Sequence, residues 1–370
     1  MRIIITGGGT AGHINPGIAI AKHIESKKPD SDILFLGTEK GLEKDLVPRE
    51  GFKIQFIKAR GFTRKISLDI FLTFRDMISG YLEAKKIIKA FKPDILVGTG
   101  GYVCLPAVLA ASRLKIPTLI HEANSFPGVA NRILGRLVDA VAISFRDTEK
   151  YFKGARRVIF TGNPVREEII STSKSDVRNI EGIDKGIPLV LVFGGSRGAQ
   201  RINEAIVEIV KLNSGNLPYN MVFATGQNQY DLIIKRLEDS GLALGQLKNI
   251  KIVPYIFDMA KYMAAADLVI SRAGAITISE ITAIGLPSIL IPFPYATENH
   301  QEFNARTLEK QGAAIVLLEK DLSAEILSQQ ITSLVNNKEQ LVRMSKNARK
   351  MGILDASEKI GEVIEELRVK

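Results

Sequence analysis

Short runs of consecutive apolar residues alternate along the chain with longer segments in which apolar residues recur every three or four positions. The first run is residues 3–5, all isoleucine, and the segment after it carries Ile14, Ile18, Ala21 and Ile24 on one helical face. An unbroken apolar run is typical of a strand buried on both sides, and the longer spacing is typical of an amphipathic helix. Alternating strands and helices predict an α/β fold with parallel sheets.

The second half of the chain repeats the plan of the first. Residues 189–193 form another apolar run, which a glycine-rich stretch and a helical pattern follow. Further along, Asp267 matches Asp94 and Pro287 matches Pro117, which are offsets of 173 and 170 residues. This period indicates a duplicated domain. We therefore predict two Rossmann-like, doubly wound domains facing a cleft, because such sheets bind ligands at the carboxyl ends of their strands.

The domain boundaries are expected at the polar stretch between the two halves. We expect a first domain over residues 1–163 and a second over residues 164–345, with the polar segment 171–176 as a loop. The charged C-terminal residues 346–370 carry four apolar side chains on one helical face. They are expected to form a helix that could pack back on the first domain.

Composition narrows the class of protein. Of the 370 residues, 45% are hydrophobic and 24% are charged, which is ordinary for a globular chain. Cys104 is the one cysteine, so no intrachain disulfide can form and a reducing compartment is expected. No apolar stretch reaches the about 18 residues of a membrane span, and the N-terminal apolar run is too short for a signal peptide. We expect a protein of the cytoplasm.

The net charge of +10 lies entirely in the first half. Residues 1–163 hold 26 lysines and arginines against 15 aspartates and glutamates, a net charge of +11, while the remaining residues hold 24 against 25. An excess of positive charge confined to the first half of the chain predicts that this half binds an anionic partner: a phosphorylated substrate, an anionic lipid surface or nucleic acid. Nucleic acid is the less suitable partner because the chain has no tryptophan and its basic half lacks interleaved aromatic residues on its strands.

A glycine loop, residues 7–12, follows the first predicted strand and opens the first predicted helix. Glycines there let backbone N–H groups approach a phosphate at a helix N-terminus. The loop also satisfies the dinucleotide-binding pattern. Asp32, however, stands at the start of the next predicted strand and not at its end, where an acidic residue would hold a ribose. A loop that needs glycine only for tight packing is a further alternative.

His13 follows this loop at the start of the first predicted helix. A helix N-terminus disfavours the imidazolium ion, so we expect a neutral side chain that can accept a proton at pH 7. The alternative is a histidine that only caps its own turn.

The second half offers a matching anion site at residues 271–280. A strand ends, a loop of small residues follows, and a helix begins with N–H groups near residues 275–277 that have no helical acceptor. These groups and the Thr277 hydroxyl could hold a diphosphate without a metal ion. Glu280 could accept hydrogen bonds from two ribose hydroxyls, or it could serve only as a favourable charge near the helix N-terminus.

Two polar stretches and one amphipathic segment complete the candidates. Asn124 closes a predicted strand and Gln301 lies in a polar helix start; both suit sugar hydroxyls, and both stretches could equally be solvated loops. Residues 62–82 carry apolar side chains on one helical face with basic residues among them. This face could pack into the core or rest on an anionic bilayer.

Seven motifs stand in order over nearly the whole chain. They are residues 6–13 (TGGGTAGH), 98–102 (GTGGY), 121–124 (HEAN), 162–166 (GNPVR), 194–199 (GGSRGA), 271–275 (SRAGA) and 300–301 (HQ). On these motifs the chain resembles the bacterial peptidoglycan N-acetylglucosaminyltransferases, which convert lipid I to lipid II. The resemblance implies the GT-B fold and the inverting transfer of N-acetylglucosamine from UDP-N-acetylglucosamine to the 4-hydroxyl of the N-acetylmuramoyl group in a polyprenyl-diphosphate-linked muramoyl-pentapeptide.

The resemblance also implies the site residues. Those at UDP-N-acetylglucosamine are Thr10, Ala11, Gly12, Asn124, Arg166, Ser196, Ile256, Ala275, Ile276, Thr277, Glu280 and Gln301. Those at the pyrophosphate of the acceptor are Gly8, Gly9, Thr10, Gly100 and Gly101. In this scheme Ser196 and the start of the helix at Ala275 hold the diphosphate, the main chain of Ile256 meets the uracil, and Glu280 meets the ribose.

His13 is expected to be the base that takes the hydroxyl proton, with Glu122 as the runner-up; such a base contributes on the order of 10²–10⁴ in rate. No Asp-x-Asp pair stands at a strand end, so neither a metal ion nor a cofactor is expected. The basic first half predicts a peripheral enzyme on the cytoplasmic face of the membrane. The alternatives are a GT-B transferase with a different acceptor and a non-catalytic protein that binds nucleic acid.

Overall fold

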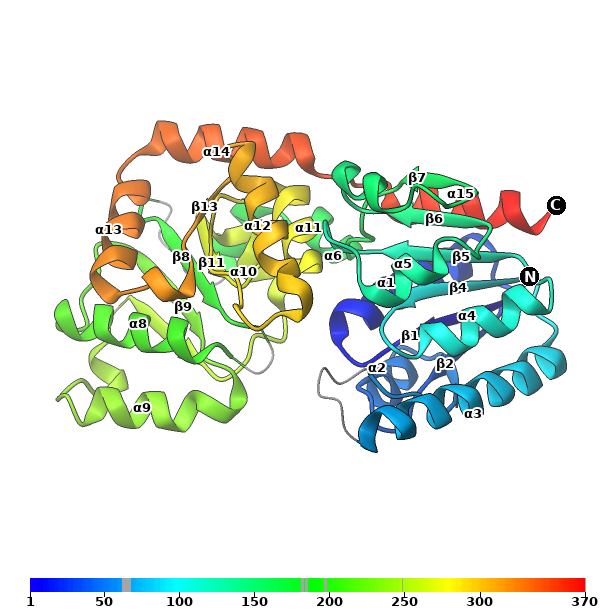
Figure 1. The fold of residues 1–370 in the computed structure, drawn as a ribbon. Helices are drawn as coiled ribbons and strands as arrows, with labels where there is room; N and C mark the ends of the chain where they lie inside the picture. Colours follow the sequence, from blue (N-terminus) through cyan, green and yellow to red (C-terminus); the bar gives the residue numbers. More distant parts are fainter. Residues whose placement is uncertain (62–67, 181–182, 184–185, 196–197, 248, 370) are drawn as a thin grey trace. The chain divides into compact units, whose positions relative to one another are not determined.

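The chain folds into two compact units, each built on its own parallel sheet (Figure 1). The computed structural model describes residues 1–61, 68–180, 183, 186–195, 198–247 and 249–369. The first unit is Met1–Val165 together with Ile353–Lys370, and the second unit is Arg166–Gly352. Each sheet carries helices on its faces, so the predicted α/β class with two Rossmann-like domains is confirmed.

The sheet of the first unit has the strand order β3-β2-β1-β4-β5-β6-β7, and all neighbouring strands pair in parallel. Its strands are β1 (Arg2–Gly7), β2 (Asp32–Gly37), β3 (Lys53–Phe56), β4 (Ile95–Gly100), β5 (Thr118–Glu122), β6 (Ala140–Ile143) and β7 (Val158–Phe160). Its helices are α1 (Ala11–Lys27), α2 (Glu43–Arg49), α3 (Leu68–Phe91), α4 (Cys104–Arg113), α5 (Val129–Leu134), the 3₁₀ helix η1 (Arg146–Tyr151) and α15 (Ala356–Arg368).

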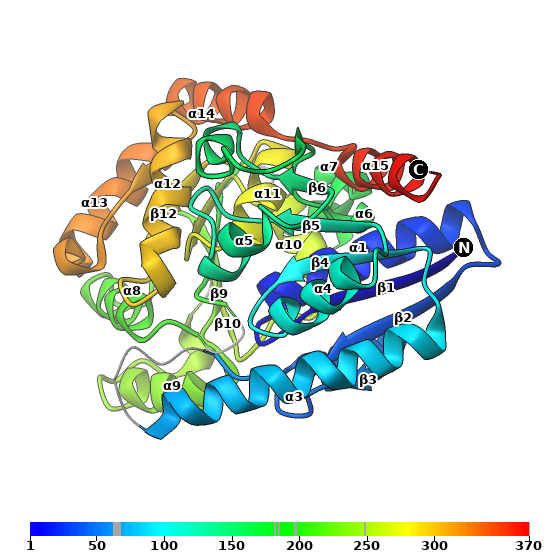
Figure 2. The ribbon, with the colours of Figure 1, turned by 45° about the vertical axis from the view of Figure 1, so that its right-hand side comes forward.

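Two hydrophobic cores cover the two faces of this sheet. Ile3 and Ile5 of β1 pack with α1 and α15, whereas Ile4 between them packs with α3 and α4. This alternation explains why residues 3–5 of β1 are all isoleucine, because both faces of the strand are buried. The C-terminal α15 lies beside α1 (Figure 2) and buries Ile360 and Ile364 in the first unit.

The second unit has the strand order β10-β9-β8-β11-β12-β13, again with parallel neighbours. Its strands are β8 (Leu189–Phe193), β9 (Asn220–Ala224), β10 (Ile250–Val253), β11 (Leu268–Ser271), β12 (Ser288–Leu290) and β13 (Ala314–Val316). Its α-helices are α6 (Glu167–Ser171), α7 (Lys174–Ile180), α8 (Gln200–Leu212), α9 (Tyr230–Glu238), α10 (Met259–Ala265), α11 (Ala275–Ile284), α12 (His300–Lys310), α13 (Ala324–Val335) and α14 (Lys338–Met351). Its 3₁₀ turns are η2 (Gln227–Gln229), η3 (Leu244–Gln246), η4 (Thr297–Asn299) and η5 (Glu319–Asp321).

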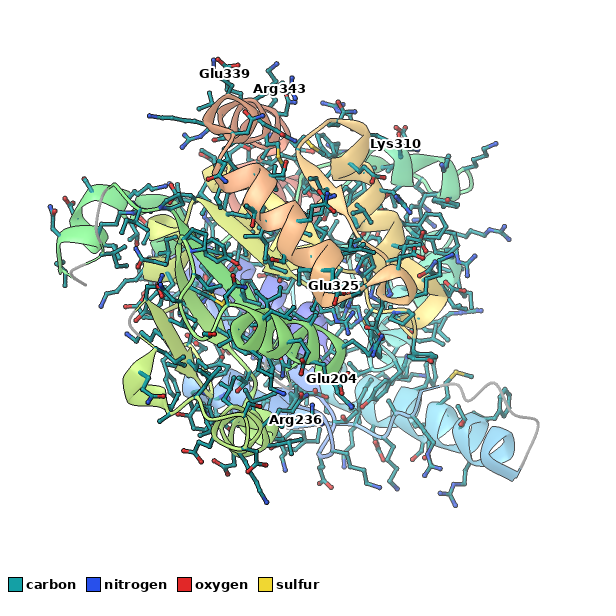
Figure 3. The ribbon with its side chains drawn as sticks, turned by 90° about the vertical axis from the view of Figure 1, so that its left-hand side faces the viewer. Glu204, Arg236, Lys310, Glu325, Glu339 and Arg343 are labelled. Carbon is teal, nitrogen blue, oxygen red and sulfur yellow. The ribbon has the colours of Figure 1, made fainter. Side chains whose placement is uncertain are left out.

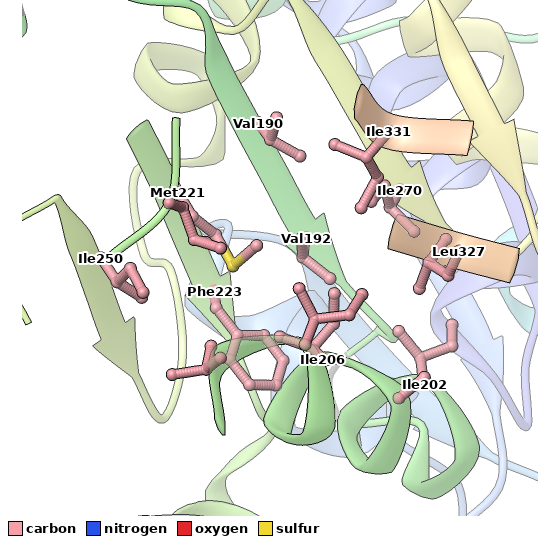
Figure 4. Packing of buried hydrophobic residues seen from close by; sticks show 14 of the residues in the cluster. Val190, Val192, Ile202, Ile206, Met221, Phe223, Ile250, Ile270, Leu327 and Ile331 are labelled. Carbon is pink, nitrogen blue, oxygen red and sulfur yellow. The ribbon is translucent and has the colours of Figure 1, made fainter. Parts of the chain in front are cut away.

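One face of this second sheet forms a core with α8 and α13 (Figure 4). Val190 and Val192 of β8 pack in the same cluster as Ile202 and Ile206 of α8, and α13 contributes Leu327. The helix covers the sheet because its apolar residues recur at helical spacing and so lie on a single side. The two units therefore repeat one plan, as the offsets in the sequence predict.

The prediction of a single helix over residues 346–370 is wrong. The first of these residues belong to the end of α14, which stops before Gly352, and the last of them form the separate helix α15. A Cβ on Gly352 would lie 2.6 Å from the carbonyl oxygen of Thr282, so the chain passes too close to α11 for another residue type. Met344 and Ala348 of α14 are buried in the second unit, which separates α14 from α15.

The polar segment 171–176, expected as a loop, contains the start of α7. Hydrophobic periodicity misses this helix because it is short and polar contacts hold it. The buried Arg178 donates to the carbonyl oxygen of Ala265 over 3.0 Å and forms an ion pair with Asp267. The Asp267 carboxylate also accepts the N–H of Leu189 at 2.8 Å, which ties α7 to the first strand of the second sheet.

The helix α3 carries an exposed apolar stripe on the first unit. Phe74, Ile78 and Leu82 are 57%, 49% and 58% exposed, and their spacing of four residues places them on one side of the helix. These three side chains are therefore not packed in the core, which was one of the two alternatives for residues 62–82. Residues 62–67 and the side chains of 68–72 lie outside the described part. Among the described helices, none has the length and apolarity to cross a bilayer.

Candidate active site

In each unit the strand order reverses beside the first strand, between β1 and β4 and between β8 and β11. Ligands of doubly wound sheets bind at such a switch point, outside the carboxyl ends of the strands. The predicted glycine loop follows β1, and Gly100 ends β4, so both lie at the switch point of the first unit. The start of α11, which follows β11, lies at that of the second unit.

Contacts within the protein already engage two amides of the glycine loop. The N–H of Gly8 donates to the carbonyl oxygen of Gly100 over 3.3 Å, and the N–H of Gly9 donates to the carboxylate of Glu43 over 2.9 Å. The N–H groups of Ala11 and Gly12, in the first turn of α1, have no acceptor in the helix itself. No side chain of the described residues caps α1, so these two amides are the better candidates for an anion.

Glycine at the end of β4 creates the space that His13 occupies. A Cβ on Gly100, whose φ is +108°, would lie 2.5 Å from Nδ1 of the His13 ring. A Cβ on Gly101 would lie 2.3 Å from the carbonyl oxygen of Gly8. The structure thus brings His13 together with the glycines expected at the acceptor pyrophosphate. The hydroxyl of Thr99 donates to the carbonyl oxygen of His13 over 2.7 Å and holds this turn on β4.

The carboxylate of Glu122, the runner-up for the base, is buried at the end of β5 and is saturated with hydrogen bonds. One oxygen accepts from the backbone and side-chain N–H groups of Asn124 at 2.9 and 3.1 Å. The other accepts from Gly128 N–H at 3.1 Å and from Nδ2 of Asn131 at 2.9 Å. Burial raises the pKa of Glu122, and these donors oppose the rise. This geometry favours a residue that positions the loop carrying Asn124 over one that accepts a proton.

His121, beside it, is also buried. Its Nε2 lies 3.1 Å from the carbonyl oxygen of Gly162 and 3.1 Å from Oγ of Ser144. Burial lowers the pKa of His121 to about 4, so the ring is neutral at pH 7. Oγ of Ser144 in turn donates to Asn163 over 2.8 Å. This network connects β5 to the Gly162–Asn163 turn that the sequence singles out.

The second unit presents the predicted helix start. α11 begins at Ala275 after Gly274, which is extended and gives α11 no side-chain cap within the described part of the chain. The amides of Ala275, Ile276 and Thr277 therefore form a first turn open to an anion. Glu280 lies one turn further along, and its buried carboxylate pairs with Arg166, with Nη2 2.8 Å from Oε1. The structure brings these predicted donor-site residues together.

Arg272 holds the loop after β12 against the end of β11. Its Nη1 donates to the carbonyl oxygens of Ile291 and Pro292, each over 3.2 Å, and its guanidinium lies 5.3 Å from the centre of the Phe293 ring. Arg272 also pairs with Glu319 over 2.5 Å. The sequence motif contains Arg272, but the residues that it joins are distant in the sequence.

The remaining predicted residues lie on separate elements. Oε1 of Gln301 accepts the N–H of Phe293 at 3.0 Å, which leaves its amide NH₂ to serve a ligand. Ile256 is buried in the loop after β10, where its main chain follows the strand end. Asn124 is half-buried beside Glu122. Ser196 lies outside the described residues.

Two features of the site could not be found from the sequence. In the sequence, Glu43 looks like an ordinary charged residue at a helix start, and Asn131 looks like a polar residue of a short helix. Both are buried, and their partners lie in other loops. Within the described part of the chain, no three His, Cys, Asp or Glu side chains gather as metal ligands. The absence of a metal requirement stays a prediction.

Comparisons with known proteins agree with this architecture. The N-terminal domain of glycosyltransferase family 28 matches residues 3–143, and the C-terminal domain of the same family matches residues 189–360. The crystal structure of MurG from Acinetobacter baumannii superposes with a TM-score of 0.77, at 30% identity and over 99% of both chains. The calicheamicin glycosyltransferase CalG4, at 14% identity and a TM-score of 0.69, shares the fold.

Closer relatives in sequence span the whole chain. The UDP-N-acetylglucosamine–N-acetylmuramyl-(pentapeptide) pyrophosphoryl-undecaprenol N-acetylglucosamine transferase of Acetivibrio thermocellus is 55% identical over 369 residues, which are 99% of this chain and 98% of the relative. The protein of that name from Ruminiclostridium cellulolyticum is 50% identical over 99% of this chain and 100% of its own length. The chain therefore belongs to glycosyltransferase family 28 and, within it, to the group of these N-acetylglucosamine transferases.

Proposed function

We propose that this enzyme transfers N-acetylglucosamine from UDP-N-acetylglucosamine to the 4-hydroxyl of the N-acetylmuramoyl group in undecaprenyl-diphospho-muramoyl-pentapeptide, giving lipid II and UDP. The observation that carries the proposal is the uncapped start of α11 with the Arg166–Glu280 pair one turn along, in a chain 55% identical to a transferase of that name. A diphosphate fits the helix start and a ribose fits a buried carboxylate.

The donor would lie on the second unit. The amides of Ala275, Ile276 and Thr277 would hold its diphosphate, and the positive end of α11 would stabilise the charge that grows on UDP as it leaves. Glu280 would accept hydrogen bonds from the ribose, and the main chain of Ile256 would meet the uracil. Ser196 would meet the diphosphate, and Asn124 and Gln301 would meet the sugar, as the resemblance implies.

The acceptor would lie on the first unit. Its pyrophosphate would bind the amides of Ala11 and Gly12, beside Thr10, because Gly8 and Gly9 donate within the protein. The acceptor hydroxyl would attack the anomeric carbon of N-acetylglucosamine from the face opposite UDP. As the new C–O bond forms, the bond to the diphosphate breaks and UDP takes the electron pair. Nε2 of His13 would take the proton, and the configuration inverts.

A metal ion would have no step in this reaction, since amides and a helix terminus would hold the diphosphate. Turnover should continue in an excess of chelator at the untreated rate. Loss of activity that only a divalent metal restores would exclude this part of the proposal.

The exposed stripe of α3, formed by Phe74, Ile78 and Leu82, supports a peripheral position on the cytoplasmic face of the membrane. Apolar side chains on a basic domain suit an anionic bilayer surface, where the chains enter the headgroup layer and the charge is attracted to the lipids. The polyprenyl chain of the acceptor lies in the same bilayer, so this face would bring the site to its substrate.

Product analysis with UDP-N-acetylglucosamine and a lipid I analogue tests the function. The expected product is the β-linked disaccharide on the lipid analogue, with one UDP released for each bond formed. Turnover of UDP-N-acetylglucosamine with another acceptor but none with lipid I analogues would support a different GT-B transferase. Thermal shifts with UDP, UDP-sugars, NAD and DNA separate the other classes, because a ligand that binds the folded state raises the melting temperature.

A further inference from the structure

Glu43, the first residue of α2, joins two loops through one carboxylate. Oε1 accepts both the N–H and the hydroxyl of Thr38, each at 2.8 Å. Oε2 accepts the N–H of Gly9 at 2.9 Å. The residue is 0% exposed. The loop after β2 is therefore tied to the glycine loop after β1 by a carboxylate that no solvent reaches.

Three glycines leave the space for this side chain. A Cβ on Gly8 would lie 2.6 Å from Oε1 of Glu43, and a Cβ on Gly41 would lie 2.0 Å from Oε2. A Cβ on Gly37 would lie 2.5 Å from Cγ. Each of these distances is shorter than van der Waals contact. Gly8 in the glycine motif is thus required by Glu43, which is a different reason from the approach of a phosphate.

The hydrogen bond to Glu43 also determines which amides of the glycine loop can meet a ligand. A carboxylate that accepts backbone N–H groups forms stronger bonds than a neutral acceptor, and it offsets the cost of its own burial in this way. The N–H of Gly9 is directed inward to Oε2, and Gly9 turns the chain with a φ of +86°. The next residues begin α1, whose first amides have no acceptor in the helix and no side-chain cap among the described residues, so they remain for an anion.

We propose that Glu43 is a positioning residue of the acceptor site. It holds Gly9 so that the N-terminus of α1 presents the amides of Ala11 and Gly12 to the acceptor pyrophosphate and keeps His13 beside the acceptor hydroxyl. It acts through the glycine loop and touches no substrate. This inference rests on the proposed function, which places the acceptor on the first unit.

The variant Glu43→Gln distinguishes the contact of Glu43 with Gly9 from its contacts with Thr38. The single amide oxygen of glutamine can accept both donors of Thr38, which places the amide NH₂ against the N–H of Gly9. Two donors that face each other repel, so the Gly9 contact is lost while the Thr38 contacts and the side-chain volume are kept. Asp45→Asn is the matched control, because Asp45 is an exposed acid in the first turn of the same helix and the change in charge is the same.

Two measurements on the full-length enzyme test the proposal. Hydrogen exchange of the Gly9 amide should become about 10- to 100-fold faster in Glu43→Gln, as expected for the loss of a hydrogen bond to a charged group. The kcat/KM for the lipid I analogue should fall by a similar factor, whereas the KM for UDP-N-acetylglucosamine and the affinity for UDP stay within about twofold. Asp45→Asn should match the wild type in all of these quantities.

The proposal is overturned if Glu43→Gln keeps wild-type exchange at the Gly9 amide or a wild-type kcat/KM for the acceptor. A fall in donor affinity equal to the fall in acceptor kcat/KM would also overturn it, since a merely structural role predicts that outcome. If Glu43→Gln does not fold, Glu43→Asp replaces it: the charge is kept, the reach is one methylene shorter, and the same split between acceptor and donor is expected. A wild-type enzyme inactive on lipid I analogues refutes the proposed function instead, while the exchange measurement still reports on the loop.

Discussion

Arg166 and Glu280 form an ion pair on a single carboxylate oxygen: Nε and Nη2 of the arginine lie 2.9 and 2.8 Å from Oε1 of the glutamate. The Glu280 side chain is 7% exposed and that of Arg166 is 48% exposed. Burial raises the pKa of Glu280, and the Arg166 guanidinium opposes this rise by stabilising the charged form. Arg166 therefore stabilises the charged form of a buried carboxylate at the place proposed for the ribose.

Glu280→Gln should weaken UDP binding by about 10- to 100-fold, because hydrogen bonds from the ribose to a charged acceptor contribute about 1.5–3 kcal/mol. The kcat at saturating donor should change little, since the ribose lies away from the bond that breaks. Isothermal titration with UDP and steady-state kinetics measure the two effects. Unchanged UDP affinity would exclude Glu280 from the nucleotide site.

Arg166→Ala should make UDP binding depend on pH. Without the guanidinium the pKa of Glu280 rises further, so a larger fraction of the carboxyl is protonated at a given pH, and the affinity for UDP should fall as the pH is lowered. The wild type should show a weaker dependence. Arg236→Ala is the control, because Arg236 pairs with Glu204 over 3.7 Å on the surface of the same unit (Figure 3). The same pH dependence in both variants would contradict the prediction.

His13→Ala should lower kcat by about 10²- to 10⁴-fold, the usual contribution of a general base, and leave UDP affinity unchanged. Gly100→Ala should also lower kcat, because the new Cβ would lie 2.5 Å from Nδ1 of His13 and must displace the ring. Gly245→Ala, where nothing lies within 4 Å of the new Cβ, serves as control. Wild-type kcat in His13→Ala would remove His13 from this role.

The free energy of unfolding of the first unit should fall as the pH drops from about 6.5 to about 4. Burial lowers the pKa of His121 to about 4 in the folded protein, whereas an unfolded histidine titrates near about 6.5. Between these two pH values the unfolded chain binds a proton at His121 that the folded chain does not bind. The free energy of unfolding is therefore highest above about pH 6.5 and falls below it, by roughly 3 kcal/mol in total.

Denaturant unfolding at several pH values measures this loss. His121→Gln should flatten the dependence between pH 6.5 and 4, even if it lowers stability at pH 7. An equally steep dependence in this variant would assign the effect to other groups.

Replacing Phe74, Ile78 and Leu82 by serine should reduce binding to vesicles that contain anionic lipids by at least about tenfold, because each side chain loses the apolar area that it could bury in the bilayer. Raising the salt concentration to about 0.5 M should weaken wild-type binding by screening the basic charge. Vesicle flotation measures both effects, and turnover of a water-soluble acceptor analogue should stay unchanged. Leu212→Ser, on a 66% exposed residue of the second unit, is the control. Equal loss in the control would refute a role specific to α3.

Much of the fold could be predicted from the sequence because the signals are local. The isoleucine run of β1 and the helical spacing after it depend only on which faces of a strand and a helix are buried. The start of α11 was predictable for the same reason, since a strand end, small residues and a helix lie within ten residues. The short α7 and the break at Gly352 were not predictable, because contacts from distant segments hold them.

The amino-acid pattern alone was enough to predict two successive α/β domains with glycine loops, parallel strands and the motifs of the family. The roles of several charged side chains became visible only in the folded chain. Glu122 becomes saturated by donors from the loop and the helix after it, Glu43 reaches back to a glycine 34 residues earlier, and Arg166 meets a glutamate 114 residues later. The role of a carboxylate depends on its burial and on the donors around it, and neither is a property of its neighbours in the chain.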